Sequence, residues 1–130
     1  MTLELTDGER VARAGAELRI GAPVALVSPR GGAIVLAAET VTDARLGPLR
    51  ALAPNTLDLA ISHRRAETLQ ARAYDGALAR VMLAETDDAR FVRATADPSL
   101  DLATPLKGPY RTRREGPADL HALALALCKQ

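Results

Sequence analysis

The amino-acid sequence predicts an α/β domain in which helices cover a mixed β-sheet. Three observations support this class. Short apolar runs bounded by glycine or proline are typical of strands, and amphipathic stretches that begin at a capping residue indicate helices. The two kinds of segment alternate along most of the chain. Two strand candidates follow each other directly near the N-terminal end, so we expect a hairpin and a mixed rather than a purely parallel sheet.

The N-terminal part of the chain predicts a helix followed by this hairpin. Thr6 and Glu9 have the spacing of a capping box, and apolar residues recur at helical spacing until Gly21 ends the run. The apolar runs 23–27 and 33–38 are the two strands, because the "SPRGG" segment between them has the composition of a tight turn.

The remaining elements alternate between helices and strands. In chain order we predict a helix capped by Thr42, a strand at 56–62, a helix capped by Ser62 and a strand in the second half of 77–85. There follow a helix with Asp87 and Asp88 in its first turn, a short strand at 110–113, and a last helix with Pro117 in its first turn. With 130 residues, the chain can form one domain with its own core.

The last predicted helix is apolar on nearly all sides, because leucines and alanines fill most of the stretch from Leu120 to Leu127. Such a helix is normally buried. The sequence ends at Gln130 without a C-terminal cap. We therefore expect this helix to pack on another subunit or to be covered by a continuation of the natural chain, and we favour the continuation. Residues 1–130 would then be a single domain and the N-terminal part of a longer chain.

Charge and composition narrow the function classes. Lys and Arg number 17 and Asp and Glu number 16, so the net charge of +1 lacks the basic excess of a nucleic-acid-binding domain. Aromatic residues make up only 2%, which leaves few rings for stacking on bases. Cys128 is the only cysteine, which excludes an intrachain disulfide and a cysteine-based zinc site. With neither a signal peptide nor a long apolar run, we expect a cytoplasmic protein without a membrane span.

Sequence motifs for catalysis and for nucleotide binding are absent. The chain contains no G-x-S-x-G turn, no G-x-G-x-x-G loop and no phosphate-binding P-loop. His63 and His121 belong to different segments, and we interpret both as ordinary helix residues. Asp87 and Asp88 are adjacent, so on a helix their side chains point about 100° apart and do not converge on a cation. We therefore predict no catalytic and no metal-binding residues in this chain.

The strongest local charge cluster lies in the segment "LKGPYRTRRE". It holds Lys107, Arg111, Arg113 and Arg114 within eight residues. In a strand at 110–113, Arg111 and Arg113 would share one face, and convergent basic side chains suit a phosphate group. A solvated basic loop explains the same pattern without a ligand. These four residues are our candidate phosphate-binding site.

Two stretches of the chain resemble a known family. The segments "GAPVALV" and "GGAIVLAAETVT" are similar to the start of 3,4-dihydroxy-2-butanone 4-phosphate synthase. The stretch "ATADPSLDLATPLKGPYRTRREGPADLHALALALCK" resembles, more narrowly, the N-terminal region of GTP cyclohydrolase II chains in which a degenerate synthase-like domain precedes the cyclohydrolase domain. Its run "ADP.LDLA.PLKGP" is the most specific part, and the likeness covers most of residues 9–129. The resemblance implies a truncated synthase-like fold and a place in riboflavin biosynthesis.

The chain departs from this family where the resemblance would place the catalytic acids. An active synthase carries acids there that bind magnesium, and on that register this chain has Gly31, Gly32 and Ala33. The histidine ligand of the family's Gly-His-Thr-Glu run falls near Asp119, with His121 near the glutamate position. Cyclohydrolase chemistry in the family needs a zinc site of three cysteines, whereas this chain has one cysteine. The resemblance therefore implies a domain without either activity of its own.

Three functions remain open at this point. The first is a non-catalytic synthase-like domain of a GTP cyclohydrolase II type protein (a hydrolase), with a structural, dimerisation or regulatory role and no cofactor of its own. Its partner would be a second copy of the chain or an attached C-terminal cyclohydrolase domain. The second is a module that binds a sugar phosphate or a nucleotide. The third is a standalone domain that assembles with itself through its last helix. We expect neither nucleic acid nor a membrane as a partner.

Overall fold

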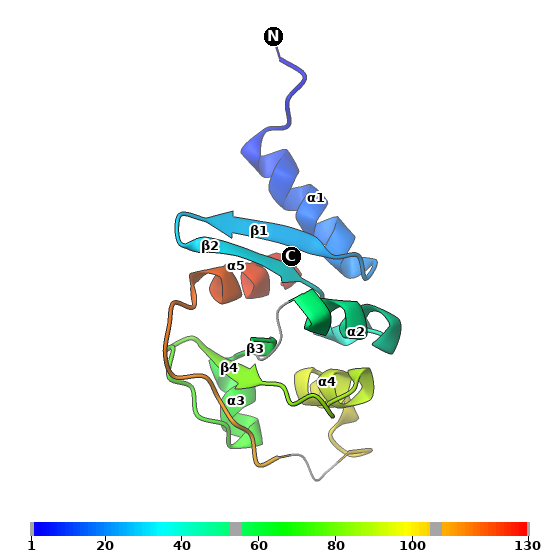
Figure 1. Cartoon of the computed structure of the whole chain (residues 1–130), viewed down its shortest axis with the longest axis vertical. Coiled ribbons are helices and arrows are strands. Elements are labelled where there is room, and N and C mark those ends of the chain that lie inside the picture. The colour runs from blue at the N-terminus through cyan, green and yellow to red at the C-terminus, as the bar shows by residue number, and fades with distance from the viewer. Residues whose placement is uncertain (1, 53–55, 105–107, 130) are drawn as a thin grey trace.

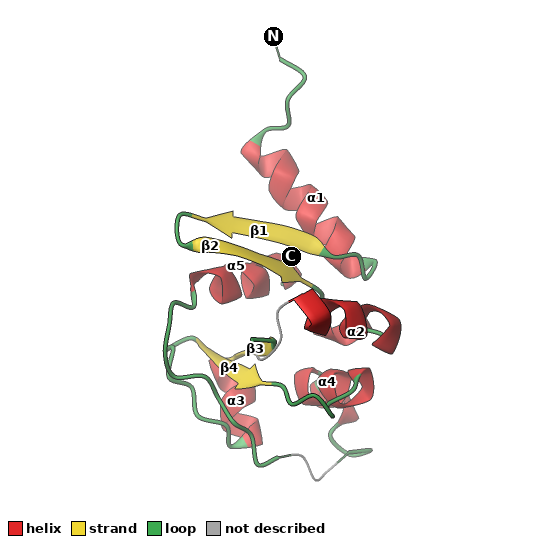
Figure 2. Ribbon diagram, in the orientation of Figure 1, coloured by secondary structure: helices red, strands yellow, loops and turns green. Residues whose placement is uncertain are grey.

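Two small antiparallel sheets, rather than one mixed sheet, organise the chain (Figures 1 and 2). The computed structural model describes residues 2–52, 56–104 and 108–129, and this part contains five α-helices and four strands. The predicted α/β class is confirmed. The predicted single mixed sheet is wrong for the described residues, because the first pair of strands does not hydrogen bond to the second pair.

The N-terminal part forms the predicted helix and hairpin. Its elements are α1 (Asp7–Arg19), β1 (Val24–Ser28) and β2 (Gly31–Val35). The Thr6 hydroxyl accepts the Glu9 N–H at 3.2 Å, and the Glu9 carboxylate accepts the Thr6 N–H at 2.9 Å, so the capping box is confirmed. The two strands pair in antiparallel register, with Val24 opposite Val35.

The second sheet lies in the middle of the chain. Its elements are β3 (Asp58–Ser62), α3 (His63–Leu69) and β4 (Leu78–Met82). The strands are antiparallel, with Asp58 opposite Met82. Ser62 ends β3 and caps α3, because its hydroxyl accepts the Arg65 N–H at 3.1 Å. The strand predicted in the second half of 77–85 lies mainly in the first half, since pairing with β3 sets its bounds.

Three further helices complete the described part. They are α2 (Asp43–Leu52), α4 (Ala89–Ala96) and α5 (Asp119–Cys128), with short 3-10 turns at Ala38–Thr40 and Pro98–Leu100. Asp88 is the N-cap of α4, because its carboxylate accepts the Phe91 N–H at 2.9 Å. Asp87 lies before the helix and accepts the Ala84 N–H at 2.7 Å. Both acids therefore precede the first turn in which we predicted them, and both bind backbone groups.

Two clusters of buried hydrophobic residues form, one beside each sheet. The β3–β4 core consists of Val41, Leu46, Leu59, Ile61, Ala66, Ala79, Val81, Ala89 and Val92. The α1–hairpin core consists of Leu18, Val24, Leu26, Ala124 and Leu127. Helix α5 packs against α1, β1, β2 and β3, so it joins the two cores.

Helix α5 buries only one of its faces. Ala124 and Leu127 are buried, whereas 43% of Leu123 is exposed. The described neighbours cover only one side of α5, and its cover by another subunit or by a continuation of the chain stays a prediction. As the sequence predicts, no helix in the described ranges is long and apolar enough to cross a membrane.

Candidate functional site

The basic segment that carries the predicted phosphate site runs along the outer edge of β4. Arg111 and Arg113 each form a backbone hydrogen bond with residues of this strand, at 2.8 and 2.7 Å. Thr112 between them forms an isolated bridge with the same strand. The short strand predicted at 110–113 is reduced to this bridge. Lys107 lies outside the described residues.

Arg113 is held by a buried carboxylate. Its Nε and Nη2 atoms donate to the Asp58 carboxylate at 2.8 and 2.9 Å, and the Asp58 side chain is 5% exposed. His121 Nε2, from α5, lies 3.4 Å from the same carboxylate. Burial raises the pKa of the Asp58 carboxyl, but hydrogen bonds from His121 and Arg113 outweigh burial and hold this pKa below its ordinary value. Arg113 therefore fixes the basic segment to β3.

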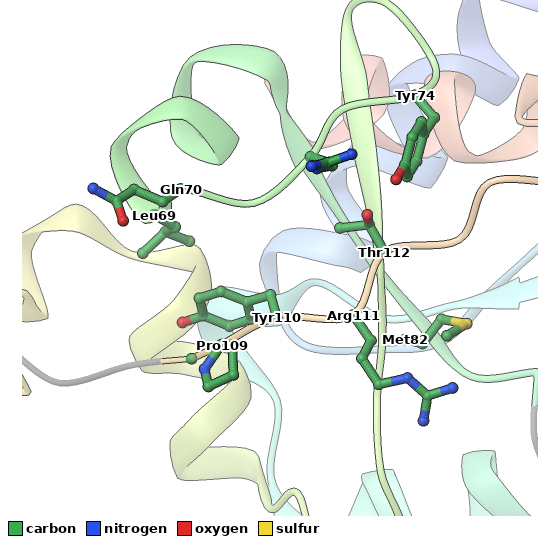
Figure 3. Close-up of a pocket in the computed structure, with 10 residues that line it drawn as sticks. Leu69, Gln70, Tyr74, Met82, Pro109, Tyr110, Arg111 and Thr112 are labelled. Atoms are coloured by element: carbon green, nitrogen blue, oxygen red, sulfur yellow. The ribbon is translucent and has the colours of Figure 1, made fainter.

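Arg114 and Arg111 have other neighbours. The Arg114 guanidinium lies over the Tyr74 ring, 5.4 Å from its centroid. Arg111 is exposed, and its side chain points away from Tyr74 and lies on the side of Met82 (Figure 3). The three described arginines of the predicted site thus face three different surroundings, although they lie within four residues of sequence.

A surface pocket of about 670 Å³ adjoins this segment (Figure 3). The end of α3, the loop that follows it, and residues 108–112 line the pocket. Among the described residues, Arg72 and Arg111 are its charged lining side chains, and no acid lines it, so the pocket is electropositive. Polar groups of Gln70, Tyr74, Tyr110 and Thr112 also line it.

The acid next to this pocket in sequence is already neutralised. Asp75 follows Tyr74 and accepts hydrogen bonds from Arg80 Nε at 2.9 Å and Nη2 at 3.1 Å. Arg80 is 2% exposed and also donates to the carbonyls of Gly116 and Pro117. Asp75 therefore does not offset the positive charge of Arg72.

A second buried arginine, Arg65, belongs to α3. Arg65 donates to both carboxylate oxygens of Asp101 at 2.8 Å, and to the carbonyls of Thr95 and Ala94 at 2.8 and 3.2 Å. The hydrogen bond to Asp101 raises the pKa of Arg65. This pair fastens α3 to the segment that follows α4. The sequence does not reveal it, because the partners are 36 residues apart.

The turn between β1 and β2 is closed by its own serine. The Ser28 hydroxyl accepts the Arg30 N–H at 3.2 Å and donates to the Gly31 carbonyl at 3.4 Å. Gly31 has φ of 143°, a conformation that favours glycine. Gly31, Gly32 and Ala33, the positions where the resemblance places catalytic acids, are the first three residues of β2 and carry no carboxylate.

The two histidines are engaged separately. His63 Nε2 lies 2.8 Å from the Glu67 carboxylate on the exposed side of α3. His121 faces Asp58 through Nε2, while its buried Nδ1 has no hydrogen-bond partner among the described residues. In the described ranges no group of three or more His, Cys, Asp or Glu side chains is arranged to hold a metal ion.

Sequence reasoning missed Arg72, the second arginine of the pocket. It stands alone between alanines in "ARAY", so no local charge pattern singles it out. The chain brings it to the pocket because α3 ends at Gln70, which adopts a left-handed conformation with φ of 59°. Only the position of residues 108–112 against β4 then places Arg111 at the same pocket.

Comparison of the chain with protein-family models, with curated proteins and with solved structures found no match in any of the three.

Proposed function

We propose that this chain is a cytoplasmic, non-catalytic domain of a riboflavin-biosynthesis protein of the GTP cyclohydrolase II type, with a truncated synthase-like fold. Its role is structural: it dimerises or stabilises the protein, or regulates an attached cyclohydrolase domain. The observation that carries the proposal is the start of β2, directly after the turn between β1 and β2. The resemblance expects acids there, and the chain has Gly31, Gly32 and Ala33.

The chemistry of this end of the hairpin supports the loss of synthase activity. Magnesium prefers carboxylate oxygens, and these three residues offer none. The polar groups of the turn bond to one another, through the Ser28 hydroxyl, the Arg30 N–H and the Gly31 carbonyl. The turn is therefore suited to closing a hairpin.

The buried charges support a structural role. Arg65, Arg80 and Arg113 each pair with a carboxylate. The pairs of Arg65 and Arg113, and the bonds from Arg80 to the carbonyls of residues 116 and 117, join segments that are distant in sequence. Removing one partner of a buried pair leaves an uncompensated charge, so the loss of either partner should destabilise the fold. The pairs leave these guanidinium groups occupied by the protein's own carboxylates.

An activity assay tests the proposal. The purified chain is incubated with ribulose 5-phosphate and Mg²⁺, with an active synthase as the positive control. We expect no 3,4-dihydroxy-2-butanone 4-phosphate, because residues 31–33 lack the acids. Formation of that product would overturn the proposal, if a substitution in the chain abolishes it and so shows that the activity belongs to this chain.

The surface pocket favours a second candidate, a module that binds a small phosphate-bearing molecule. Arg72 and Arg111 line it without an acid among the described residues, and Arg114 lies against Tyr74 at its border. Guanidinium groups suit phosphate oxygens, and the hydroxyl of Thr112 could donate a further hydrogen bond.

Titration with inorganic phosphate and with phenyl phosphate, followed by amide NMR, tests this candidate. We expect shifts at residues 70–74 and 108–112, and an affinity about tenfold lower for Arg72→Gln. Arg90→Gln is the matched control, because Arg90 is an exposed arginine of α4 away from the pocket. Equal affinities for the two variants, or no shifts at millimolar ligand, would remove the candidate.

A further inference from the structure

An apolar cleft of about 470 Å³ lies between the two sheets. Unbroken runs of residues from both sides line it, 33–40 from β2 onward and 56–62 along β3. A strand presents only alternate side chains on one face, so unbroken runs indicate that the edges of β2 and β3 border the cleft. In the described residues no strand pairs with either edge.

Such edges are incomplete. An unpaired strand edge presents a row of backbone N–H and C=O groups, and it readily accepts an added strand. Here two edges border one space, so a single extended segment between them would meet backbone groups on both of its sides. In the described part of the chain, the cleft is thus bordered by unpaired backbone N–H and C=O groups on two sides, like the space left in a sheet when one strand is missing.

The walls of the cleft are suited to apolar side chains. Small side chains leave space in the cleft, because its lining includes Ala33, Ala37, Ala38, Ala60, Ala96 and Ala124. The acid Asp58 and the base Arg65 also line it, and each is paired, with Arg113 and Asp101. The other charged residues of the lining, Arg19, Glu39 and Lys129, are exposed. An uncharged, aliphatic face therefore fits this space better than a charged one.

The N-terminal arm, residues 2–5, has the pattern of such a strand. Its sequence "TLEL" alternates polar and apolar residues. Leu3 is 98% exposed and Leu5 is 40% exposed. The arm is neither helix nor strand, and it projects away from the rest of the molecule (Figure 1). It is therefore an apolar segment that the single chain leaves uncovered.

The arm cannot fill the cleft of its own chain without rearrangement. The cleft borders the C-terminal end of α1, at Leu18, which lies about 17 Å along the helix from Asp7. Residues 2–6 span at most about 17 Å when fully extended. The chain would have to reverse sharply at Thr6, whose capping box fixes its direction.

We infer that the arm of a second copy of this chain inserts between β2 and β3 as an added strand. Two copies then exchange arms in a closed two-fold dimer, in which each cleft receives one arm. Leu3 and Leu5 are buried in the cleft, and Glu4 is directed to its exposed side, where the bases Arg19 and Lys129 outnumber the acid Glu39. This inference deepens the assembly role in the proposed function and rests on it.

Sedimentation equilibrium of the full chain tests the exchange. We expect a dimer of the 13.7 kDa chain, and a dissociation constant at least about a hundredfold higher for the double variant Leu3→Ser/Leu5→Ser, because two leucines lose their burial. The matched control is Leu102→Ser, since Leu102 is 97% exposed and does not line the cleft. It should dimerise like the unchanged chain.

Cross-linking identifies the place of insertion. Cys128 lines the cleft and is the only cysteine, so Leu3→Cys and Leu5→Cys each add one thiol to the arm. Burial and the nearby Glu39 raise the pKa of the Cys128 thiol, so oxidation by copper–phenanthroline is carried out at alkaline pH. We expect a disulfide-linked dimer for at least one arm variant, but not for Leu102→Cys or the unchanged chain.

The outcomes separate the inference from the proposed function. A dimer that persists in Leu3→Ser/Leu5→Ser, or equal cross-linking of the arm and control variants, would overturn arm exchange. A chain that stays monomeric would also overturn it. None of these experiments measures synthase activity. The activity assay therefore tests the proposed function separately.

Discussion

In the described residues, the β3–β4 core buries nine hydrophobic residues and is bordered by arginine–carboxylate pairs, whereas the α1–hairpin core buries five. The second region also leaves apolar side chains in solvent: Ile20 is 80%, Val27 is 82% and Ile34 is 45% exposed. The β3–β4 core thus buries more apolar side chains, although Leu52 on α2 is 70% exposed. The α1–hairpin core buries fewer, and the single chain leaves the outward face of its hairpin uncovered.

The register of the hairpin explains this difference. Ala25 pairs with Ile34 and Val27 pairs with Gly32, so these four residues share the outward face of the hairpin. The inward face, with Val24 and Leu26, is apolar as well. A two-stranded hairpin is stable only when other elements cover it, and the single chain covers one face. The single chain therefore leaves the outward face of this hairpin exposed.

The largest expected effect comes from Arg80→Met in the region of the β3–β4 core. Arg80 is 2% exposed, and its loss leaves the Asp75 carboxylate without its partner. We expect the free energy of unfolding to fall by about 3–5 kcal/mol in urea denaturation. The exposed Arg90→Met should stay within about 0.5 kcal/mol of the unchanged chain. Equal losses in the two variants would contradict a structural role for the pair.

In the α1–hairpin core, Leu18→Ala should cost about 3 kcal/mol, because Leu18 is 1% exposed and its truncation leaves a cavity. The neighbouring Ile20→Ala, at an 80% exposed position, is the control. Hydrogen exchange of the variant sharpens the comparison. We expect amides of β1 and β2 to lose protection before those of β3 and β4, and a uniform loss would show that the two cores unfold as one unit.

The charge of Asp58 makes stability depend on pH. Its pKa is lowered in the folded chain, so the unfolded chain binds more protons at acid pH and stability falls as pH drops below the ordinary value of 3.8. Asp58→Asn should cost about 2 kcal/mol near neutral pH, because Arg113 loses two charge-assisted hydrogen bonds. Its urea midpoint should vary less between pH 5 and pH 3 than that of the unchanged chain, and an equal fall would disprove the link.

The smallest effect is expected for Val27→Thr on the outward face of the hairpin. In the single chain Val27 is 82% exposed, so unfolding measured at low protein concentration should change by less than about 0.5 kcal/mol. A larger loss that appears only at high concentration would show that this face is covered by association, and it would sharpen the contrast between the two regions.

Local signals predict much of the fold. The capping box at Thr6, the hairpin around "SPRGG" and the cap at Ser62 were readable because each depends on residues a few positions apart. The separation into two sheets could not be predicted from the sequence, because the alternation of helices and strands does not determine which strands pair. The α/β class could therefore be predicted, and the sheet topology could not.

The candidate site follows the same division. The cluster of Arg111, Arg113 and Arg114 is plain in the sequence, but their fates differ because Asp58 is 55 residues from Arg113 and Tyr74 is distant from Arg114. Arg72 has no local signal at all. The closeness of Arg111, Arg113 and Arg114 in the sequence predicted that these arginines form one basic cluster. It could not predict which partner each guanidinium contacts.

By itself the sequence determined the helices, the hairpin, the absence of acids at residues 31–33 and the alternating pattern of the arm, because these depend on neighbouring residues and on side-chain chemistry. Only the tertiary structure decided that Arg113 meets Asp58, that Arg72 joins Arg111, and that β2 and β3 border one apolar cleft. Such contacts arise from segments that fold together across many residues, and their free energy is set by packing and burial that local patterns do not encode.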